Sequence, residues 1–396
     1  MNEQIRFGEV FQVKRIDENG NAIIEDKTIK TDGVKAGKGH NAPLIVSYDG
    51  ITGYYKNSTD TSTAAYDHFE YVICGLGKKL GVSMAETYKL YQGGKDIGII
   101  SESVNKPGDT SYDMSSILEL RKGNPNHFPI DTAGISSIVS DYVSLNVSEN
   151  METFVDQNDD SISHEYIVLK TPADIEQAIV GFPKLVSLLQ IPDEQKENIE
   201  QAYYDMLMLD LITGNVDRNR DNYGLIQRSD GTIEFSPLYD NSTIVIPHLP
   251  EGLTQVNGYF MNRDRLLECL YEHHYDRISH ITTELYENRQ EYEEFLHQVC
   301  ERDLEKSESG WLLGGHIGPQ VEKICEREEL KKNKIDESQT VEEYIEVAQV
   351  VKQSEKETIK PEIEEYVEAS EAFNKVVENV NAEQPIDSTI EGSKTL

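Results

Sequence analysis

The chain has 396 residues, which is enough for one large bilobal domain or two medium ones. Its formal net charge is −35, from 37 Lys and Arg against 72 Asp and Glu, and a field of this sign repels nucleic acid and anionic membrane surfaces. No segment approaches the length of an apolar membrane span, and the first residues lack the apolar run of a signal peptide. We therefore expect a soluble, cytoplasmic protein that binds neither nucleic acid nor membranes.

The cysteines and histidines show no spacing typical of metal ligands. Four cysteines lie far apart without a C-x-x-C pair, namely Cys74, Cys269, Cys300 and Cys325. We expect reduced, mostly buried thiols in place of a zinc or disulfide framework. The adjacent His273 and His274 are expected at the surface.

Residues 1–101 are predicted to form a small β-rich lobe. Short β-branched or aromatic runs predict its strands: IRFGEVFQV, NAIIED, PLIVSY, ITGYYK, ETYKLYQ and DIGIIS. The segments ENGN at 18–21 and YDGI at 48–51 are typical of hairpin turns. One helix interrupts the strands, with apolar residues at helical spacing and a glycine suited to its end: Phe69, Val72, Ile73, Leu76, Leu80 and Gly81.

Residues 102–332 are predicted to form a larger, mostly helical lobe. Its strongest helix covers about 193–213, with one apolar face and Gly214 as its terminator. Two short strands, YGLIQR and TIEFSP, follow around an SDG turn. Residues 333–396 form an acidic tail, partly helical or disordered, which either only solubilises the chain or binds a regulatory partner.

The stretch LITGNVDRNRDNYGLIQRSDGTIEFSPLYDN, residues 211–241, contains the pattern that phosphoryl transfer needs. That chemistry requires an acid to orient the attacking hydroxyl and take its proton, and two oxygen ligands for Mg²⁺. Asp217 and Asn222 are five positions apart, as are the orienting acid and the metal-binding Asn of kinase loops. A hairpin then returns the chain to Asp240, the predicted second metal ligand. The alternative is a polar surface loop, since Asp, Asn and Arg are common turn residues.

The strings GNVDRNRDNYGLI and SPLYDN resemble the HipA-type serine/threonine kinases, which are distantly related to phosphatidylinositol 3/4-kinases. The resemblance implies an α+β, protein-kinase-like bilobal fold, with Asp217 as the catalytic acid and Asn222 and Asp240 as metal ligands. The chain departs from the family at Asn219, where the family has a His that assists phosphate or loop geometry.

The resemblance extends into the small lobe. ITGYYK is similar to the family's strand that ends in a phosphate-binding lysine, here Lys56, and EYVICGLGKKLGV is similar to its helix with an acid, here Glu70, that orients this lysine. Without the resemblance, Lys56 would be a solvated residue and Glu70 a helix-surface glutamate. The glycine-rich segment at 31–42, with Gly37 and Lys38, either cradles phosphates or is a plain flexible loop.

Taken together, the sequence predicts an ATP- and Mg²⁺-dependent kinase that phosphorylates a Ser or Thr hydroxyl of an unidentified protein. Arg218 or Arg220 would steady the loop or the transferring phosphoryl group. Two alternatives stay open. One is a kinase of a lipid or small-molecule hydroxyl, which the charge of −35 disfavours for an anionic lipid. The other is a nucleotide-binding pseudokinase or scaffold, which Asn219 favours.

Overall fold

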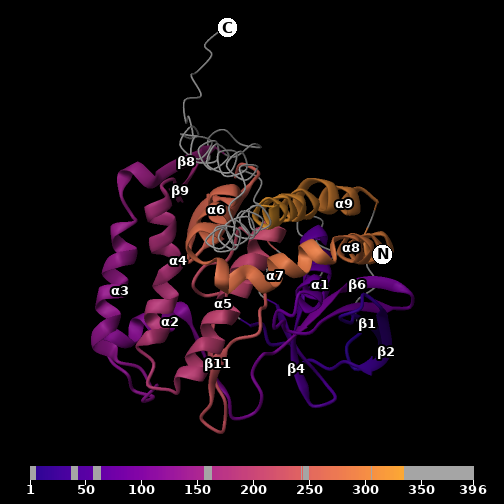
Figure 1. Ribbon diagram of the computed structural model, residues 1–396. Coiled ribbons are helices and arrows are strands. Elements are labelled where there is room, and N and C mark those ends of the chain that lie inside the picture. Colours follow the sequence, from indigo (N-terminus) through magenta and orange to yellow (C-terminus); the bar gives the residue numbers. More distant parts are fainter. Residues whose placement is uncertain are drawn as a thin grey trace, which may run out of the picture. The chain divides into compact units, whose positions relative to one another are not determined.

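The computed structural model describes residues 6–36, 43–56, 64–155, 163–241, 243, 249–304 and 306–333, without the side chains of 64–67 and 307. The chain divides into two compact units, Met1–Glu328 and Glu329–Leu396. The fold described here is that of the first unit, which consists of a β-rich lobe and a larger helical lobe (Figure 1).

The β-rich lobe contains a six-stranded antiparallel sheet in the order β2-β1-β5-β6-β4-β3. Its strands are β1 (Val10–Ile16), β2 (Ala22–Thr28), β3 (Leu44–Tyr48), β4 (Ile51–Lys56), β5 (Thr87–Gln92) and β6 (Lys95–Glu102). Both predicted hairpins are present, since β1 pairs with β2 and β3 with β4. Asp49 and Gly50 join β3 to β4 with φ of 48° and 80°, as a two-residue hairpin turn requires.

Helix α1 (Ala64–Lys79) is the predicted helix of this lobe, and it packs on β1, β5 and β6. The apolar residues predicted from helical spacing are all buried: Phe69, Val72, Ile73, Leu76 and Leu80. Gly81 follows with φ of 76°, the left-handed conformation that ends a helix. Glu70 is also buried, with 1% of its surface exposed, so the interpretation as a surface glutamate is wrong.

The helical lobe is built around a buried central helix, α5. Its helices are α2 (Met114–Glu119), α3 (Thr132–Ser144), α4 (Pro172–Ser187), α5 (Asp193–Thr213), α6 (Arg263–His273), α7 (Tyr275–Glu287), α8 (Arg289–Asp303) and α9 (Lys306–Trp311). A π-helical turn, Leu312–Ile317, follows α9, and short 3-10 turns cover Leu120–Lys122 and Ser148–Asn150. The cysteines are free and buried, as predicted.

Helix α5 has the predicted bounds, and Gly214 ends it with φ of 73°. The prediction of one apolar face is wrong for its second half, in which every residue from Met206 to Thr213 is buried. Helices α4, α6 and α7 and strands β11 and β12 all pack on α5, so no side of this half meets solvent. A helix enclosed in this way can place a polar residue, Asp210, deep in the lobe.

Two small sheets complete the helical lobe. One has the order β11-β10-β7, from β7 (Thr110–Asp113), β10 (Gly224–Gln227) and β11 (Ile233–Phe235). The other has the order β12-β13-β9-β8, from β8 (Met151–Val155), β9 (Ser163–Leu169), β12 (Leu253–Val256) and β13 (Tyr259–Asn262). The hairpin β10–β11 was predicted, whereas its pairing with β7 was not.

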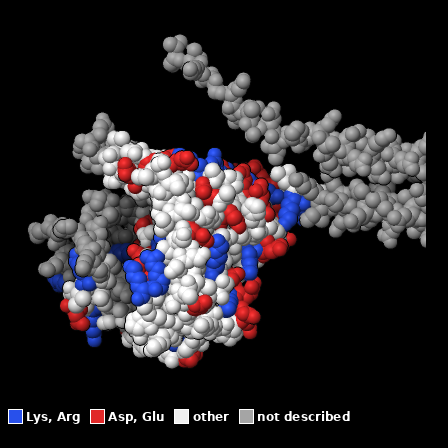
Figure 2. Space-filling view, turned by 90° about the vertical axis from the view of Figure 1, so that its left-hand side faces the viewer, with Lys and Arg blue, Asp and Glu red and all other residues white. Residues whose placement is uncertain are grey.

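No helix in the described part of the chain combines the length and the apolar content that crossing a membrane requires. Figure 2 shows the face of the first unit nearest α3, on which small groups of Lys and Arg alternate with groups of Asp and Glu beside a broad uncharged area. The acidic excess of the sequence is therefore not spread evenly over this face.

Candidate active site

A cavity of about 580 Å³ opens between the two lobes. From the β-rich lobe it is lined by residues that include Tyr54, Lys56, Glu70, Ser101 and Glu102, and from the opposite side by Asp221, Gly224, Leu225, Tyr239 and Asp240. Its volume lies within the range of about 300 to 1,000 Å³ that is usual for small-molecule and cofactor sites.

Lys56, the last residue of β4, joins the two lobes inside this cavity. Its Nζ lies 2.5 Å from Glu70 Oε2 on α1 and 2.8 Å from Asp240 Oδ1 of the helical lobe. Burial lowers the pKa of Lys56, but the carboxylates of Glu70 and Asp240 outweigh this effect and raise it above its ordinary value. Lys56 is thus a fixed cation in the cavity.

Asp240 is positioned by the backbone segment that precedes it. Leu238 exchanges two backbone hydrogen bonds of 2.8 Å with Ser83 and Ala85, which ties this segment to the β-rich lobe. Asp240 itself has φ of 54°, a left-handed conformation that is uncommon outside glycine. The charge of Lys56 lowers the pKa of Asp240, so its carboxylate stays ionised.

Arg218 holds the loop that follows α5. It is fully buried and donates from Nε and Nη2 to the two carboxylate oxygens of Asp210, at 2.8 and 3.0 Å. It also donates to Asn222 O at 2.8 Å, to Tyr239 O at 3.2 Å and to Asn241 Oδ1 at 2.5 Å. One guanidinium therefore joins α5, the loop and the two neighbours of Asp240.

The C-terminal end of α5, where the loop begins, is held by a second buried arginine. Arg263 donates from Nε to Leu211 O at 2.8 Å and from Nη2 to Ile212 O at 2.6 Å. A cation at the carbonyl end of a helix is favoured by the helix dipole. Burial lowers the pKa of Arg263 to about 10.

Asp217 and Asn222 lie side by side on this loop. Asn222 donates from Nδ2 to Asp217 O at 2.7 Å, and Asn219 donates from Nδ2 to Asp217 Oδ1 at 2.9 Å. Burial raises the pKa of Asp217, and the neighbouring charge of Asp240 adds to this effect. The hydrogen bond from Nδ2 fixes the amide of Asn222, so its Oδ1 is the atom that a cation would contact.

The structure thus brings most of the predicted residues to one place. Lys56, Glu70 and Asp240 line the cavity, while Asp217 and Asn222 lie on the adjoining loop and are not among the lining residues. Gly37 and Lys38 fall outside the described residues, so their predicted contact with phosphate stays a prediction.

The two arginines of the loop, which the sequence did not distinguish, have different surroundings. Arg218 steadies the loop from inside. The Arg220 guanidinium lies 4.3 Å from the ring centre of Tyr142 and donates to Tyr259 Oη at 3.0 Å. Asp210, the partner of Arg218, was not predicted, because an acid inside a long helix is usually a surface residue. Its position between apolar residues on both sides was the signal that could have indicated a buried acid.

The oxygen atoms of Asp240 and Asn222 fit a hard divalent cation. Mg²⁺ binds carboxylate and amide oxygens, and Asp240 and Asn222 provide one of each. Arg218 hydrogen-bonds to the backbone of Asn222 and to both neighbours of Asp240, so one buried guanidinium fixes the positions of both residues.

No family model and no curated protein sequence matches this chain. Among solved structures, the Helicobacter pylori proinflammatory kinase CtkA is similar over 74% of this chain and 95% of its own, at 14% identity and a TM-score of 0.39. A glucosamine kinase is similar over 76% of each chain, at 11% identity and a TM-score of 0.18. The architecture is α+β with a β-rich lobe, a helical lobe and a cavity between them, as in a kinase-like bilobal fold.

Proposed function

We propose that this chain is an ATP- and Mg²⁺-dependent kinase of the HipA-like type that phosphorylates a Ser or Thr hydroxyl of a protein. The observation that carries the proposal is the Lys56–Glu70–Asp240 arrangement in the cavity between the lobes. A lysine fixed by a buried glutamate of the neighbouring helix is the group that holds the α- and β-phosphates in protein kinases. Asp240 contacts this lysine at 2.8 Å, and we assign it the role of the metal-binding acid.

Each residue then has one task. Lys56 holds phosphate oxygens, and Glu70 keeps its ammonium group in place. Asn222 and Asp240 would hold Mg²⁺, which neutralises charge on the triphosphate. Lys56 now contacts both acids, so binding of ATP exchanges its contact with Asp240 for phosphate.

Asp217 acts on the acceptor. Its carboxylate orients the hydroxyl and takes the proton as the hydroxyl oxygen bonds to the γ-phosphorus. The bond from that phosphorus to the β–γ bridging oxygen breaks, and ADP leaves with the bonding electrons. The raised pKa of Asp217 suits this task, because a more basic carboxylate accepts a proton more readily.

The test is transfer from labelled ATP, with Mg²⁺, to the protein itself and to proteins of a cell lysate. Asp217→Asn should lower the rate at least about 100-fold, because the base is lost while the shape is kept. Nucleotide affinity should hold, since the change acts on the transition state. Asp230→Asn, in the β10–β11 turn, is the matched control and should leave the rate unchanged.

The pseudokinase alternative is favoured by one contact, the hydrogen bond from Asn219 to the carboxylate of Asp217. This hydrogen bond occupies one of the two carboxylate oxygens of Asp217, the proposed base. Asn219→His should preserve or raise the rate of an active kinase. A parent protein that binds ATP yet transfers phosphate to no protein and not to water would contradict the kinase proposal.

A further inference from the structure

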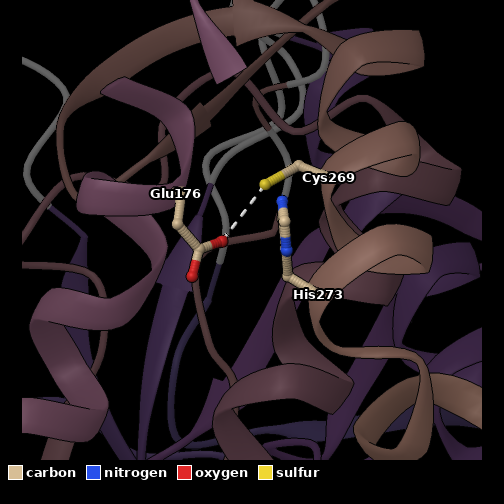
Figure 3. Close-up of side chains that lie close together, drawn as sticks. All are labelled: Glu176, Cys269 and His273. Carbon is tan, nitrogen blue, oxygen red and sulfur yellow. Dashed lines mark hydrogen bonds between the residues drawn. The ribbon is translucent and has the colours of Figure 1, made fainter. Parts of the chain in front are cut away.

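A second cluster of reactive side chains lies between α4 and α6, and it shares no residue with the cavity. Figure 3 shows Glu176 of α4 facing Cys269 and His273 of α6. One atom of each, a carboxylate oxygen, Sγ and a ring nitrogen, lie within 4.8 Å of one another. Cys269 and His273 are four positions apart on one helix, so both side chains project from the same face.

A fourth side chain reaches the same carboxylate. His274, which follows α6, has its Nε2 at 2.9 Å from Glu176 Oε2, and Cys269 Sγ lies 3.3 Å from the same oxygen. The other ring nitrogen of His274, Nδ1, lies 3.0 Å from Tyr204 Oη. Such a partner on the second nitrogen orients a metal-binding histidine and fixes its tautomer. The expectation that His274 is a surface residue is wrong, because 12% of its side chain is exposed.

The charge of Glu176 has no permanent cation beside it. Among the described residues its ion-pair partner is His274, and no Lys or Arg forms an ion pair with it. The Glu176 side chain is 31% exposed, so its carboxylate is open to solvent on one side and faces Cys269 and His274 on the other. Here an acid, a thiol and the imidazole of His273 converge, and the imidazole of His274 contacts the same carboxylate. Half of the His273 side chain is exposed, which leaves a path from solvent.

We propose that Glu176, Cys269, His273 and His274 form a structural zinc site that fastens α4 to the end of α6. Sulfur, imidazole nitrogen and carboxylate oxygen are the ligands of tetrahedral Zn²⁺. Ligand atoms around such an ion lie roughly 3.3–3.8 Å apart, which the Glu176–Cys269 distance of 3.3 Å already meets. Rotation of the exposed His273 side chain would bring its ring nitrogen within this range of the other ligand atoms, which now lie up to 4.8 Å away. On binding, the Cys269 thiol loses its proton to solvent and the thiolate bonds to zinc.

The experiment uses the full chain, from which a chelator has removed bound metal. Excess Mg²⁺ is present so that it competes with zinc for the cavity between the lobes. Zinc is added and unbound metal is removed. We expect one zinc per chain, and a melting temperature that rises with zinc. Cobalt in place of zinc should give the absorption of a tetrahedral site with a sulfur-to-cobalt band.

Two variants remove ligands and two serve as controls. Cys269→Ser and His273→Ala should each weaken zinc binding at least about 10-fold and abolish the zinc-dependent rise in melting temperature. Cys325→Ser, another buried cysteine, and His297→Ala, another exposed histidine of the helical lobe, should bind zinc as the parent does. Circular dichroism checks that every variant is folded.

Three outcomes overturn the proposal. They are a stripped parent that takes up no stoichiometric zinc, a Cys269→Ser variant that binds zinc as tightly as Cys325→Ser, and a cobalt spectrum without a sulfur band. None of these measurements depends on phosphoryl transfer. A failed zinc site therefore leaves the kinase proposal untouched, and the reverse holds as well.

Discussion

The cavity between the lobes and the α4–α6 cluster balance negative charge in different ways. In the cavity and its loop, three acids have a cation of the chain itself: Lys56 contacts Glu70 and Asp240, and Arg218 contacts Asp210. In the α4–α6 cluster, the side chains that bond to Glu176 in the described part of the chain are neutral or weakly basic, namely Cys269 and His274. Tyr204 in turn bonds to His274.

This difference predicts how each region responds when its ligand is removed. A permanent guanidinium or ammonium group keeps the acids in place without a ligand, so the cavity is preorganised for the proposed nucleotide. A cluster of acid, thiol and imidazole has no permanent cation of its own, and a divalent metal bound there would supply the positive charge. The stability of the first region therefore depends on Lys56 and Arg218, and that of the second on the proposed metal.

Removing the cation of the loop should have the largest effect on stability. Arg218→Met leaves Asp210 as a buried, unpaired carboxylate and should lower the free energy of unfolding by about 3–5 kcal/mol. Urea unfolding measures the change. Arg289→Met, which breaks an exposed pair with Glu293, is the control and should cost less than about 0.5 kcal/mol. A loss below about 1 kcal/mol for Arg218→Met would mean that the charge of Asp210 is balanced elsewhere.

The next largest effect concerns His316, which forms no ion pair with an acid among the described residues. Burial and the charge of Arg263 lower the pKa of His316 to about 4. The unfolded chain binds the proton more tightly, at a pKa of about 6.5, so protonation of His316 opposes folding. Stability should fall as the pH drops from about 6.5 to 4, by up to about 3 kcal/mol from this group alone.

The difference between parent and His316→Gln isolates this contribution, because the other groups titrate equally in both. Urea unfolding at pH 7, 5 and 4 should show the variant losing less stability than the parent. Identical losses in the two proteins would exclude His316 as the source.

A smaller effect distinguishes the two arginines of the loop. Arg220→Met removes the cation from the rings of Tyr142 and Tyr259 and should lower stability by about 1 kcal/mol. Arg220 contacts these rings and does not contact Lys56, Glu70 or Asp240. The phosphoryl-transfer rate should therefore fall less than about 10-fold. A loss of rate as large as that of Asp217→Asn would place Arg220 on the transferring group.

The smallest effect is expected for the acidic tail. Deleting residues 333–396 should shift the melting temperature by less than about 2 °C, because the sequence of this segment has little large apolar content with which to add to a core. Differential scanning calorimetry measures the shift. A drop of many degrees would show that the tail packs on the remainder of the chain.

Local patterns determined the secondary structure near the site. The apolar spacing of α1, the bounds of α5 with Gly214, and the hairpin after Asn222 follow from side-chain periodicity and from glycine conformation, which act over a few residues. Asp217, Asn222 and Asp240 could be predicted from the sequence because all three lie in one segment, residues 211–241. Their roles remain predictions.

Only the tertiary structure decided which charged and reactive groups meet. Glu70 is buried because α1 packs on the sheet beside Lys56, and Asp210 is buried because helices and strands enclose α5. Glu176 meets Cys269 because α4 packs on α6, although 93 positions separate them in the sequence. A residue's neighbours along the chain determine its backbone conformation, whereas the cost of burying its charge depends on groups that packing brings from elsewhere.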